Sequence, residues 1–113
     1  MTRVLVCGSR NFTDAALLEA CLDEIPRITA IIEGGAVGAD RLARHFARLR
    51  GVTVETFPAE WATHGLAAGP IRNKRMLVEG KPDLVVAFPG GPGAADMVRQ
   101  ARAAGVKVIE ITE

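Results

Sequence analysis

The sequence predicts an α/β fold in three layers, a Rossmann-like parallel sheet of about five strands with helices on both faces. Three observations indicate this fold class. Short apolar runs alternate with segments of helical spacing along the chain. Hydrophobic residues make up 49% of the chain and aromatic residues only 4%, a composition typical of buried parallel strands covered by Ala-rich helices. Glycine-rich turns follow several apolar runs and lead into helices. The simplest strand order is 3-2-1-4-5, with right-handed crossovers.

Composition and charge narrow the functional classes. The chain of 113 residues is expected to form one domain, residues 1–113, large enough for a core without metal or disulfide support. A net charge of +1 gives no overall attraction to nucleic acid or to a membrane. Cys7 and Cys21 fall on apolar faces and are expected to be free thiols. Met1–Cys7 is too short for a signal peptide and no run reaches membrane-spanning length, so we expect a cytoplasmic protein without metal or cofactor.

The first half of the chain is predicted to contain two strands and two helices. Continuous apolar runs indicate strands that are buried on both faces. Thr13 or Asp14 can cap the first helix, and Pro26 stops it. Gly51 ends the second helix. The predicted elements are a strand over Val4–Cys7, a helix from about Thr13 or Asp14 to Pro26, a strand over Ala30–Ile32 and a helix from Ala39 to Leu49.

The second half is predicted to contain three strands and two helices. Val52–Phe57 alternates loosely, as expected at a sheet edge, and Pro58–Gly69 has no regular pattern. A helix starts at Gly69-Pro70, with proline in its first position, and ends at Gly80. The remaining elements are a strand over Asp83–Phe88, a helix that presents Ala94, Met97, Val98, Ala101 and Ala104 to the sheet and ends at Gly105, and a strand over Val106–Ile111.

Glycine and polar residues are expected to converge on one edge of this sheet. In a parallel sheet, the carboxyl ends of the strands and the N-termini of the following helices lie on the same side. Residues scattered in sequence therefore form one rim in space. The expected ligand-binding residues are Gly8, Ser9, Arg10, Gly34, Gly35, Gly38, Asp40, Trp61, Arg72, Asn73, Pro89, Gly90, Gly91 and Gly93.

The chemistry of this rim suits a phosphate group. The glycine turns at residues 34–38 and 90–93 put unobstructed backbone N–H groups at helix starts, an arrangement typical of phosphate binding. Glycines also serve as plain turn residues. Ser9, Arg10 and Arg72 add further donors. Arg72 is predicted to lie in the first turn of its helix, where a cation is disfavoured unless an anion is present.

Other residues of the rim suit a nucleoside, although each has a simpler interpretation. Trp61 could cover a flat base, but a tryptophan is also a common core anchor. Asp40, Asn73 or Asp96 could accept hydrogen bonds from ribose hydroxyls, but the two aspartates could equally cap helices. His64 is more simply a surface residue than a base. A stripe of Arg41, Arg44 and Arg48 is more simply a solvated helix face than a nucleic-acid interface.

Five motifs are spread over nearly the whole chain. They are Gly8-Ser9-Arg10-x-Phe12, Gly34-Gly35-Ala36-x-Gly38-Ala39-Asp40, Pro58-Ala59-x-Trp61, Ala68-Gly69-Pro70-x-Arg72-Asn73-x-x-Met76 and Phe88-Pro89-Gly90-Gly91-x-Gly93. Together they resemble the YspA-like (YpsA-related) branch of the SLOG superfamily, which joins the DprA (Smf) DNA-processing proteins and the Lonely Guy phosphoribohydrolases. The resemblance implies a Rossmann-like fold and a nucleotide or nucleotide-derived ligand. It also implies a homo-oligomer, because relatives in the superfamily often dimerise.

The resemblance to Lonely Guy enzymes is incomplete. These enzymes cleave the N-glycosidic bond of nucleoside 5′-monophosphates with an Arg of Arg-Lys-x-x-Met and a Glu that closes Pro-Gly-Gly-x-Gly-Thr-x-x-Glu. Here Arg72 matches the first motif, with Asn73 in place of Lys. In the second, Ala94 replaces Thr and Met97 replaces Glu, and a thioether cannot transfer protons. Asp96 is one position away, about 100° around a helix. Arg72 and Asp96 are thus the catalytic candidates of this chain.

Three functions follow, in order of preference. The first is binding or sensing of a nucleotide-like small molecule through the glycine-rich loops. The second is N-glycosidic hydrolysis of nucleoside monophosphates, with Asp96, Asp40 or Glu60 in place of the missing Glu. The third is DprA-like binding of single-stranded DNA through the arginine stripe, which the near-neutral charge makes the least favoured.

Overall fold

The computed structural model describes residues 1–112, so Glu113 of the expected domain lies outside the described residues. A five-stranded parallel sheet forms the centre, in the order β3-β2-β1-β4-β5. This confirms the predicted α/β fold and strand order. The elements are β1 (Thr2–Cys7), α1 (Ala15–Asp23), β2 (Ile28–Glu33), α2 (Ala39–Arg50), β3 (Thr53–Thr56), α3 (Trp61–His64), the 3-10 helix η1 (Gly65–Ala67), α4 (Ala68–Gly80), β4 (Leu84–Ala87), α5 (Pro92–Ala103) and β5 (Lys107–Glu110).

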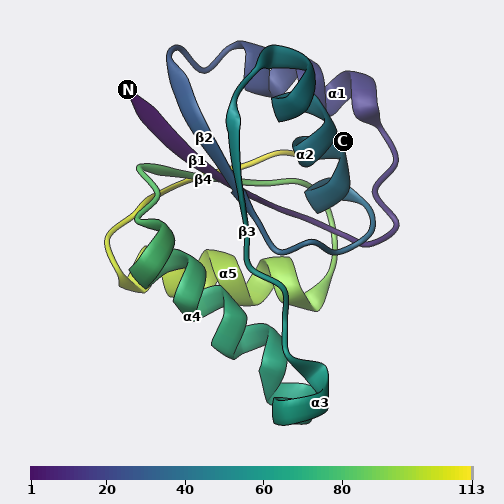
Figure 1. Ribbon diagram of the computed structural model, residues 1–113, viewed down its shortest axis with the longest axis vertical. Coiled ribbons are helices and arrows are strands. Elements are labelled where there is room, and N and C mark those ends of the chain that lie inside the picture. The colour runs from purple at the N-terminus through teal and green to yellow at the C-terminus, as the bar shows by residue number, and fades with distance from the viewer. Residues whose placement is uncertain (113) are drawn as a thin grey trace.

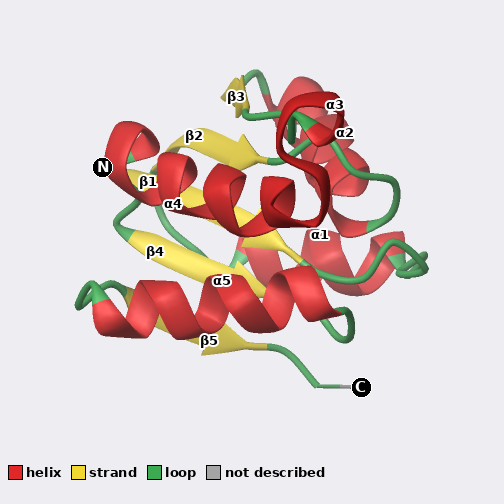
Figure 2. Ribbon diagram, turned by 90° about the horizontal axis from the view of Figure 1, so that it is seen from below, coloured by secondary structure: helices red, strands yellow, loops and turns green. Residues whose placement is uncertain are grey.

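The helices form two layers, one on each face of the sheet. In Figure 1, α1 and α2 lie on one side of the strands, and α4 and α5 lie on the other. Figure 2 shows the strands in a row from β3 to β5, with α4 and α5 on the side of the sheet nearer the viewer. Alternate residues of β1 separate the two core layers: Val4 and Val6 pack toward α1 and α2, whereas Leu5 and Cys7 pack toward α4 and α5. This division follows from the two-residue repeat of a strand.

Several helix boundaries have a visible cause. The Asp14 carboxylate accepts a hydrogen bond from the Leu17 N–H at 3.0 Å and so caps α1, one of the two caps expected. Gly51 ends α2 in the left-handed region, with φ +68°. Pro92 occupies the first turn of α5, where its missing N–H leaves no hydrogen bond unmade.

Residues 58–69 are more regular than the sequence indicates. They contain α3 and η1, so the chain forms five α-helices and not four within the described residues. Helix α4 begins at Ala68, which makes Pro70 its third residue and not its first. Helix α3 is four residues long, and none of its side chains is buried, so it has no apolar period to detect. It projects beyond the start of α4 in Figure 1.

The connections leave β1 and β4 on opposite faces of the sheet. The chain runs from β1 through α1 to β2 on one face, and from β4 through α5 to β5 on the other. The carboxyl ends of β1 and β4 therefore flank the switch point, where open α/β sheets bind ligands. Among residues 1–112, none of the helices combines the length and apolar character needed to cross a membrane.

Candidate functional site

A cavity of about 410 Å³ opens at this switch point. It receives residues from the loops after β1, β2 and β4 and from the start of α4. The expected residues that line it are Gly8, Arg10, Gly34, Gly35, Asp40, Trp61, Arg72, Asn73, Gly91 and Gly93. The structure thus brings together glycine turns that are far apart in sequence, with Arg72 between them.

Four expected ligand-binding residues do not line the cavity. Ser9 accepts a hydrogen bond from the Asn11 N–H at 2.9 Å, and its carbonyl accepts one from the Ala39 N–H at 3.3 Å. Gly38 has φ +89°, and a Cβ there would clash with the Ser9 carbonyl. Ser9 and Gly38 therefore pack two loops against each other. Pro89 and Gly90 line a separate hollow beside β5.

Arg72 is held over the β2–α2 turn by two hydrogen bonds. Its Nη1 donates to the Gly34 carbonyl at 3.0 Å, and its Nε donates to Asn73 Oδ1 at 3.0 Å. A Cβ at position 34 would overlap the guanidinium, so glycine is required for this approach. Because α4 begins at Ala68, Arg72 lies just past the first helical turn and not within it as predicted.

Asn73 and Asp96 are committed to protein partners. Asn73 Nδ2 donates to the Gly93 carbonyl at 3.1 Å and to Asp96 Oδ2 at 2.9 Å. Asp96 Oδ2 also accepts a hydrogen bond from Gln100 Nε2 at 2.8 Å, and its Oδ1 accepts one from Arg99. Asp96 is 8% exposed and does not line the cavity. This catalytic candidate therefore contacts the Asn73 amide and not the cavity.

The β2–α2 turn is already filled by the carboxylates of the protein. Asp40 Oδ2 accepts hydrogen bonds from the N–H groups of Gly34 at 3.1 Å and Ala36 at 3.2 Å. Glu33 Oε1 accepts one from the Gly35 N–H at 2.7 Å. Three successive amides are therefore engaged, whereas the sequence suggested that this turn would share in holding a phosphate.

Glu33 anchors the β2–α2 turn from outside the cavity, and sequence reasoning did not find it. It is fully buried at the end of β2 and also binds Arg44, at 3.3 Å, and the Thr56 hydroxyl. A glutamate that closes an apolar run was the available signal, because a buried carboxylate needs partners. The arginine stripe is divided accordingly: Arg44 pairs with Glu33, Arg41 lines the cavity and Arg48 is exposed.

The β4–α5 turn is chemically different. Gly91, Gly93 and Ala94 line the cavity, and their N–H groups have no hydrogen-bond partner within residues 1–112. Gly93 and Ala94 belong to the first turn of the twelve-residue helix α5, whose dipole adds partial positive charge. This end of the cavity is therefore suited to an anion.

Burial controls the titration of two groups on the cavity wall. Desolvation raises the pKa of Asp40 to about 6, and the nearby charge of Glu33 adds to the rise, against the opposing effects of the loop amides and Arg72. Burial raises the pKa of the Cys7 thiol to about 12, so this cysteine is no nucleophile near neutral pH. In the described part of the chain, no group of three or more His, Cys, Asp and Glu side chains is arranged to hold a metal.

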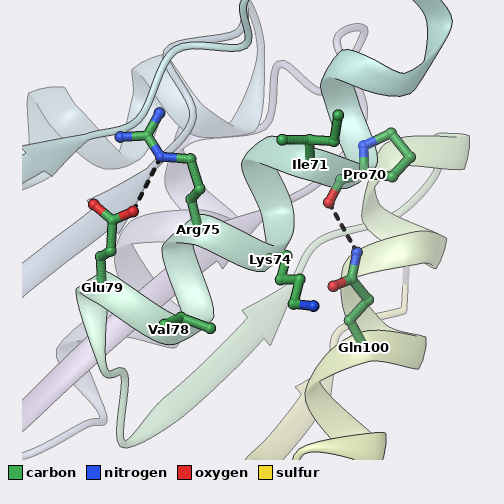
Figure 3. Close-up of a pocket in the computed structure, with 7 residues that line it drawn as sticks. All are labelled: Pro70, Ile71, Lys74, Arg75, Val78, Glu79 and Gln100. Atoms are coloured by element: carbon green, nitrogen blue, oxygen red, sulfur yellow. Dashed lines mark hydrogen bonds and ion pairs between the residues drawn. The ribbon is translucent and has the colours of Figure 1, made fainter. Parts of the chain in front are cut away.

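A second hollow of about 490 Å³ lies between α4 and α5, on the surface that faces away from the sheet (Figure 3). Arg75 bonds Glu79 at 3.2 Å along α4, and Gln100 of α5 donates to the Pro70 carbonyl at 3.1 Å. It contains none of the expected ligand-binding residues. Its exposed Ile71 and Val78 belong to the kind of apolar helix face that a homo-oligomer would cover, and oligomerisation stays a prediction.

Comparison with known proteins places this architecture in a family. The family model described as "YspA, cpYpsA-related SLOG family" matches residues 2–64. The Gene 61 protein of Mycobacterium phage D29 is 39% identical over 120 residues, which cover 96% of this chain and 95% of that protein. A crystal structure of glycinamide ribonucleotide transformylase 1 from Symbiobacterium toebii is similar at 20% identity and a TM-score of 0.44, and this chain spans 61% of its length. The chain belongs to the YspA, cpYpsA-related SLOG family.

Proposed function

We propose that this protein binds a nucleotide or nucleotide-derived small molecule, with a phosphate at the start of α5 and Arg72 beside it. One observation carries the proposal: unpaired amides of Gly91, Gly93 and Ala94 share a cavity with the Arg72 guanidinium. Backbone amides at a helix start and a guanidinium both donate hydrogen bonds to phosphate oxygens. Membership of the SLOG family supports a nucleotide-related role.

The position of Trp61 supports a flat group in the same ligand. Its side chain lines the cavity and is 56% exposed, unusual for the largest apolar side chain. An indole at a cavity mouth can stack on a base and shield it from water. The chain has one tryptophan and no tyrosine, so Trp61 is also a direct fluorescent reporter of this cavity.

Two alternatives have less support from the geometry. For hydrolysis, Met97 stands in place of the expected Glu and is fully buried in the core, and both oxygens of Asp96 are engaged. For binding of single-stranded DNA, the arginine stripe would need to form one basic surface. Arg44 instead bonds the buried Glu33, and Arg41 faces the cavity.

The test is a comparison of Arg72→Ala with Lys74→Ala. Arg72 faces the cavity, whereas Lys74 is an exposed cation of the same helix and lines the outer hollow. Calorimetric titration with the four ribonucleoside 5′-monophosphates is expected to show about 10- to 150-fold weaker binding for Arg72→Ala and unchanged binding for Lys74→Ala. The fold-change corresponds to about 1.5–3 kcal/mol for a hydrogen bond to a charged group.

Two further readouts make the test decisive. Thermal unfolding of each variant separates lost binding from lost folding, because Arg72 also bonds the Gly34 carbonyl. Unchanged affinity in a folded Arg72→Ala protein would remove Arg72 from the site. Chromatography of the incubated nucleotides for free base distinguishes binding from hydrolysis, and turnover would replace the binding proposal with an enzymatic one. Mass spectrometry of small molecules released by denaturing the purified protein can identify a carried ligand.

A further inference from the structure

The cavity contains one carboxylate oxygen that is without a protein partner. Of the three residues suited to accept a ribose hydroxyl, Asn73 uses its amide nitrogen and its oxygen within the protein, and Asp96 uses both oxygens. Asp40 uses only Oδ2. No hydrogen bond to Asp40 Oδ1 exists among residues 1–112, and this oxygen is not sealed from solvent.

Asp40 is also fixed in position. Its Oδ2 is anchored by the N–H groups of Gly34 and Ala36, and the residue is only 7% exposed. Its remaining contact with solvent is through the cavity that it lines. A carboxylate held in this way is pre-organised, so a ligand group that meets Oδ1 need not order the side chain.

The charges that line the cavity determine which ligand group Asp40 can bind. Arg10, Arg41 and Arg72 line the wall, and Asp40 is the only acidic residue on it among the described residues. A carboxylate repels a phosphate, so the phosphate is directed to the α5 end. The oxygen at Asp40 is suited to a neutral donor, and a hydroxyl–carboxylate hydrogen bond is among the stronger ones.

We infer that the cavity selects ribonucleotides over deoxyribonucleotides, with Asp40 Oδ1 accepting a hydrogen bond from a ribose hydroxyl while the phosphate lies at the start of α5. This inference rests on the proposed function and deepens it by naming the sugar. It assigns different chemistry to the two glycine turns: the turn after β4 binds the anion, and the turn after β2 presents the hydroxyl acceptor.

The experiment is a titration of the whole protein with matched sugars at pH 7.5, followed by Trp61 fluorescence and calorimetry. The probes are the ribonucleoside 5′-monophosphate that binds most tightly of the four, its 2′-deoxy form and its 3′-deoxy form. The ribonucleotide is expected to bind at least about tenfold more tightly than one of the deoxy forms, as for a hydrogen bond to a charged group. This comparison needs no variant, so it does not depend on whether a mutant folds.

Asp40→Asn then tests whether the carboxylate causes the preference. The asparagine oxygen can keep the anchor to Gly34 and Ala36, while its amide removes the charged acceptor. The ratio of ribonucleotide to deoxynucleotide affinity is expected to fall below about threefold. Glu33→Gln is the matched control, because Glu33 anchors the same turn without lining the cavity. In this control the ratio should be kept.

The outcomes separate the inference from the function on which it rests. Equal affinity for all three sugars in the wild-type protein overturns the inference and leaves nucleotide binding in place. A folded Asp40→Asn protein whose affinity for all three nucleotides falls by the same factor also overturns the inference, because Asp40 would then only anchor the turn. Binding of none of the nucleotides overturns the proposed function and the inference together.

Discussion

The two glycine turns of the cavity look alike in sequence and differ in chemistry. The turn after β2 gives the N–H groups of Gly34, Gly35 and Ala36 to Glu33 and Asp40, whereas the amides of the turn after β4 have no protein partner among residues 1–112. The first turn is complete without a ligand. The second leaves donors that a ligand can satisfy.

A glycine-rich loop is therefore not by itself a phosphate site. Carboxylates on either side of the first turn fold back onto its amides and occupy the position that an anion would take. In the second turn, the nearby carboxylate of Asp96 binds Asn73, Arg99 and Gln100 instead. A turn is filled when the neighbouring acidic side chain accepts hydrogen bonds from its amides, and it is open when that side chain bonds other side chains instead.

Removing the carboxylate that fills the first turn should have the largest effect. Glu33→Ala leaves Arg44, Thr56 and the Gly35 N–H without their buried partner, and we expect a loss of about 3–5 kcal/mol in the free energy of unfolding. Glu110→Ala, which breaks an exposed pair with Arg102, should change it by less than about 1 kcal/mol. Urea unfolding of both variants measures the difference. Similar small losses would contradict the structural importance of the filled turn.

The second effect is a pH dependence that comes from Asp40. Its pKa of about 6 in the folded protein exceeds the ordinary value of 3.8, so the folded state binds this proton more tightly than the unfolded state. The resulting stability is fully present below about pH 3.8 and is lost as the pH rises through about 6. The loss is on the order of 3 kcal/mol.

Asp40→Asn isolates this effect from the other titrating groups. We expect the stability of the variant, relative to wild type, to increase between pH 4 and pH 7, as measured by urea unfolding at each pH. A difference that does not change with pH would show that Asp40 is ionised alike in both states.

Gly34→Ala should break the filled turn from the other side. The added Cβ would overlap the Arg72 guanidinium, and we expect a loss of about 1–3 kcal/mol in the free energy of unfolding, together with weaker nucleotide binding. Gly51→Ala cannot serve as a control for the added Cβ, because Gly51 has a positive φ and an alanine there would be strained for that separate reason. Calorimetry and thermal unfolding test both effects, and a variant with wild-type stability and affinity would show that Arg72 can move without loss.

Gly93→Ala should give the smallest change in stability and so define the contrast between the turns. A Cβ at position 93 meets no atom within 4 Å, and alanine favours the helix, so the unliganded protein should gain up to about 1 kcal/mol. The methyl group lies beside the amides proposed to bind phosphate, and binding of nucleoside monophosphates should weaken. Denaturant unfolding measures the expected gain in stability, and calorimetry measures the expected loss of nucleotide affinity. A destabilised Gly93→Ala protein with unchanged nucleotide affinity would contradict the proposed difference between the two turns.

Most of the fold could be predicted because its signals are local or periodic. Continuous apolar runs indicated the buried strands, the loose alternation of Val52–Phe57 indicated an edge strand, and Asp14 was one of two expected caps. Helix α3 could not be predicted, because four residues without a buried side chain have no periodicity. It ends at Gly65, whose φ of +58° leaves the right-handed helical region.

The candidate site was predictable as a location and not as a set of contacts. The rule that strand ends and helix starts share an edge was enough to bring Arg10, Asp40 and Arg72 to one cavity. The partners of Glu33, and the commitment of Asp96 to Asn73, depend on side chains from different elements meeting across the sheet edge. The spacing of residues along the chain does not predict such contacts.

The parallel sheet, its strand order and the edge at which glycine and polar residues gather could be read from the sequence alone, because they follow from hydrophobic period, turn residues and the handedness of crossovers. Which amides are free and which carboxylate oxygen has no protein partner depend on contacts between elements in the folded chain. The reason is that a buried donor or acceptor takes whichever partner the folded chain brings within reach. Asp40 and Asp96 were both expected near the start of a helix, but Asp40 lies in the first turn of α2, Asp96 is the fifth residue of α5, and the two meet different neighbours.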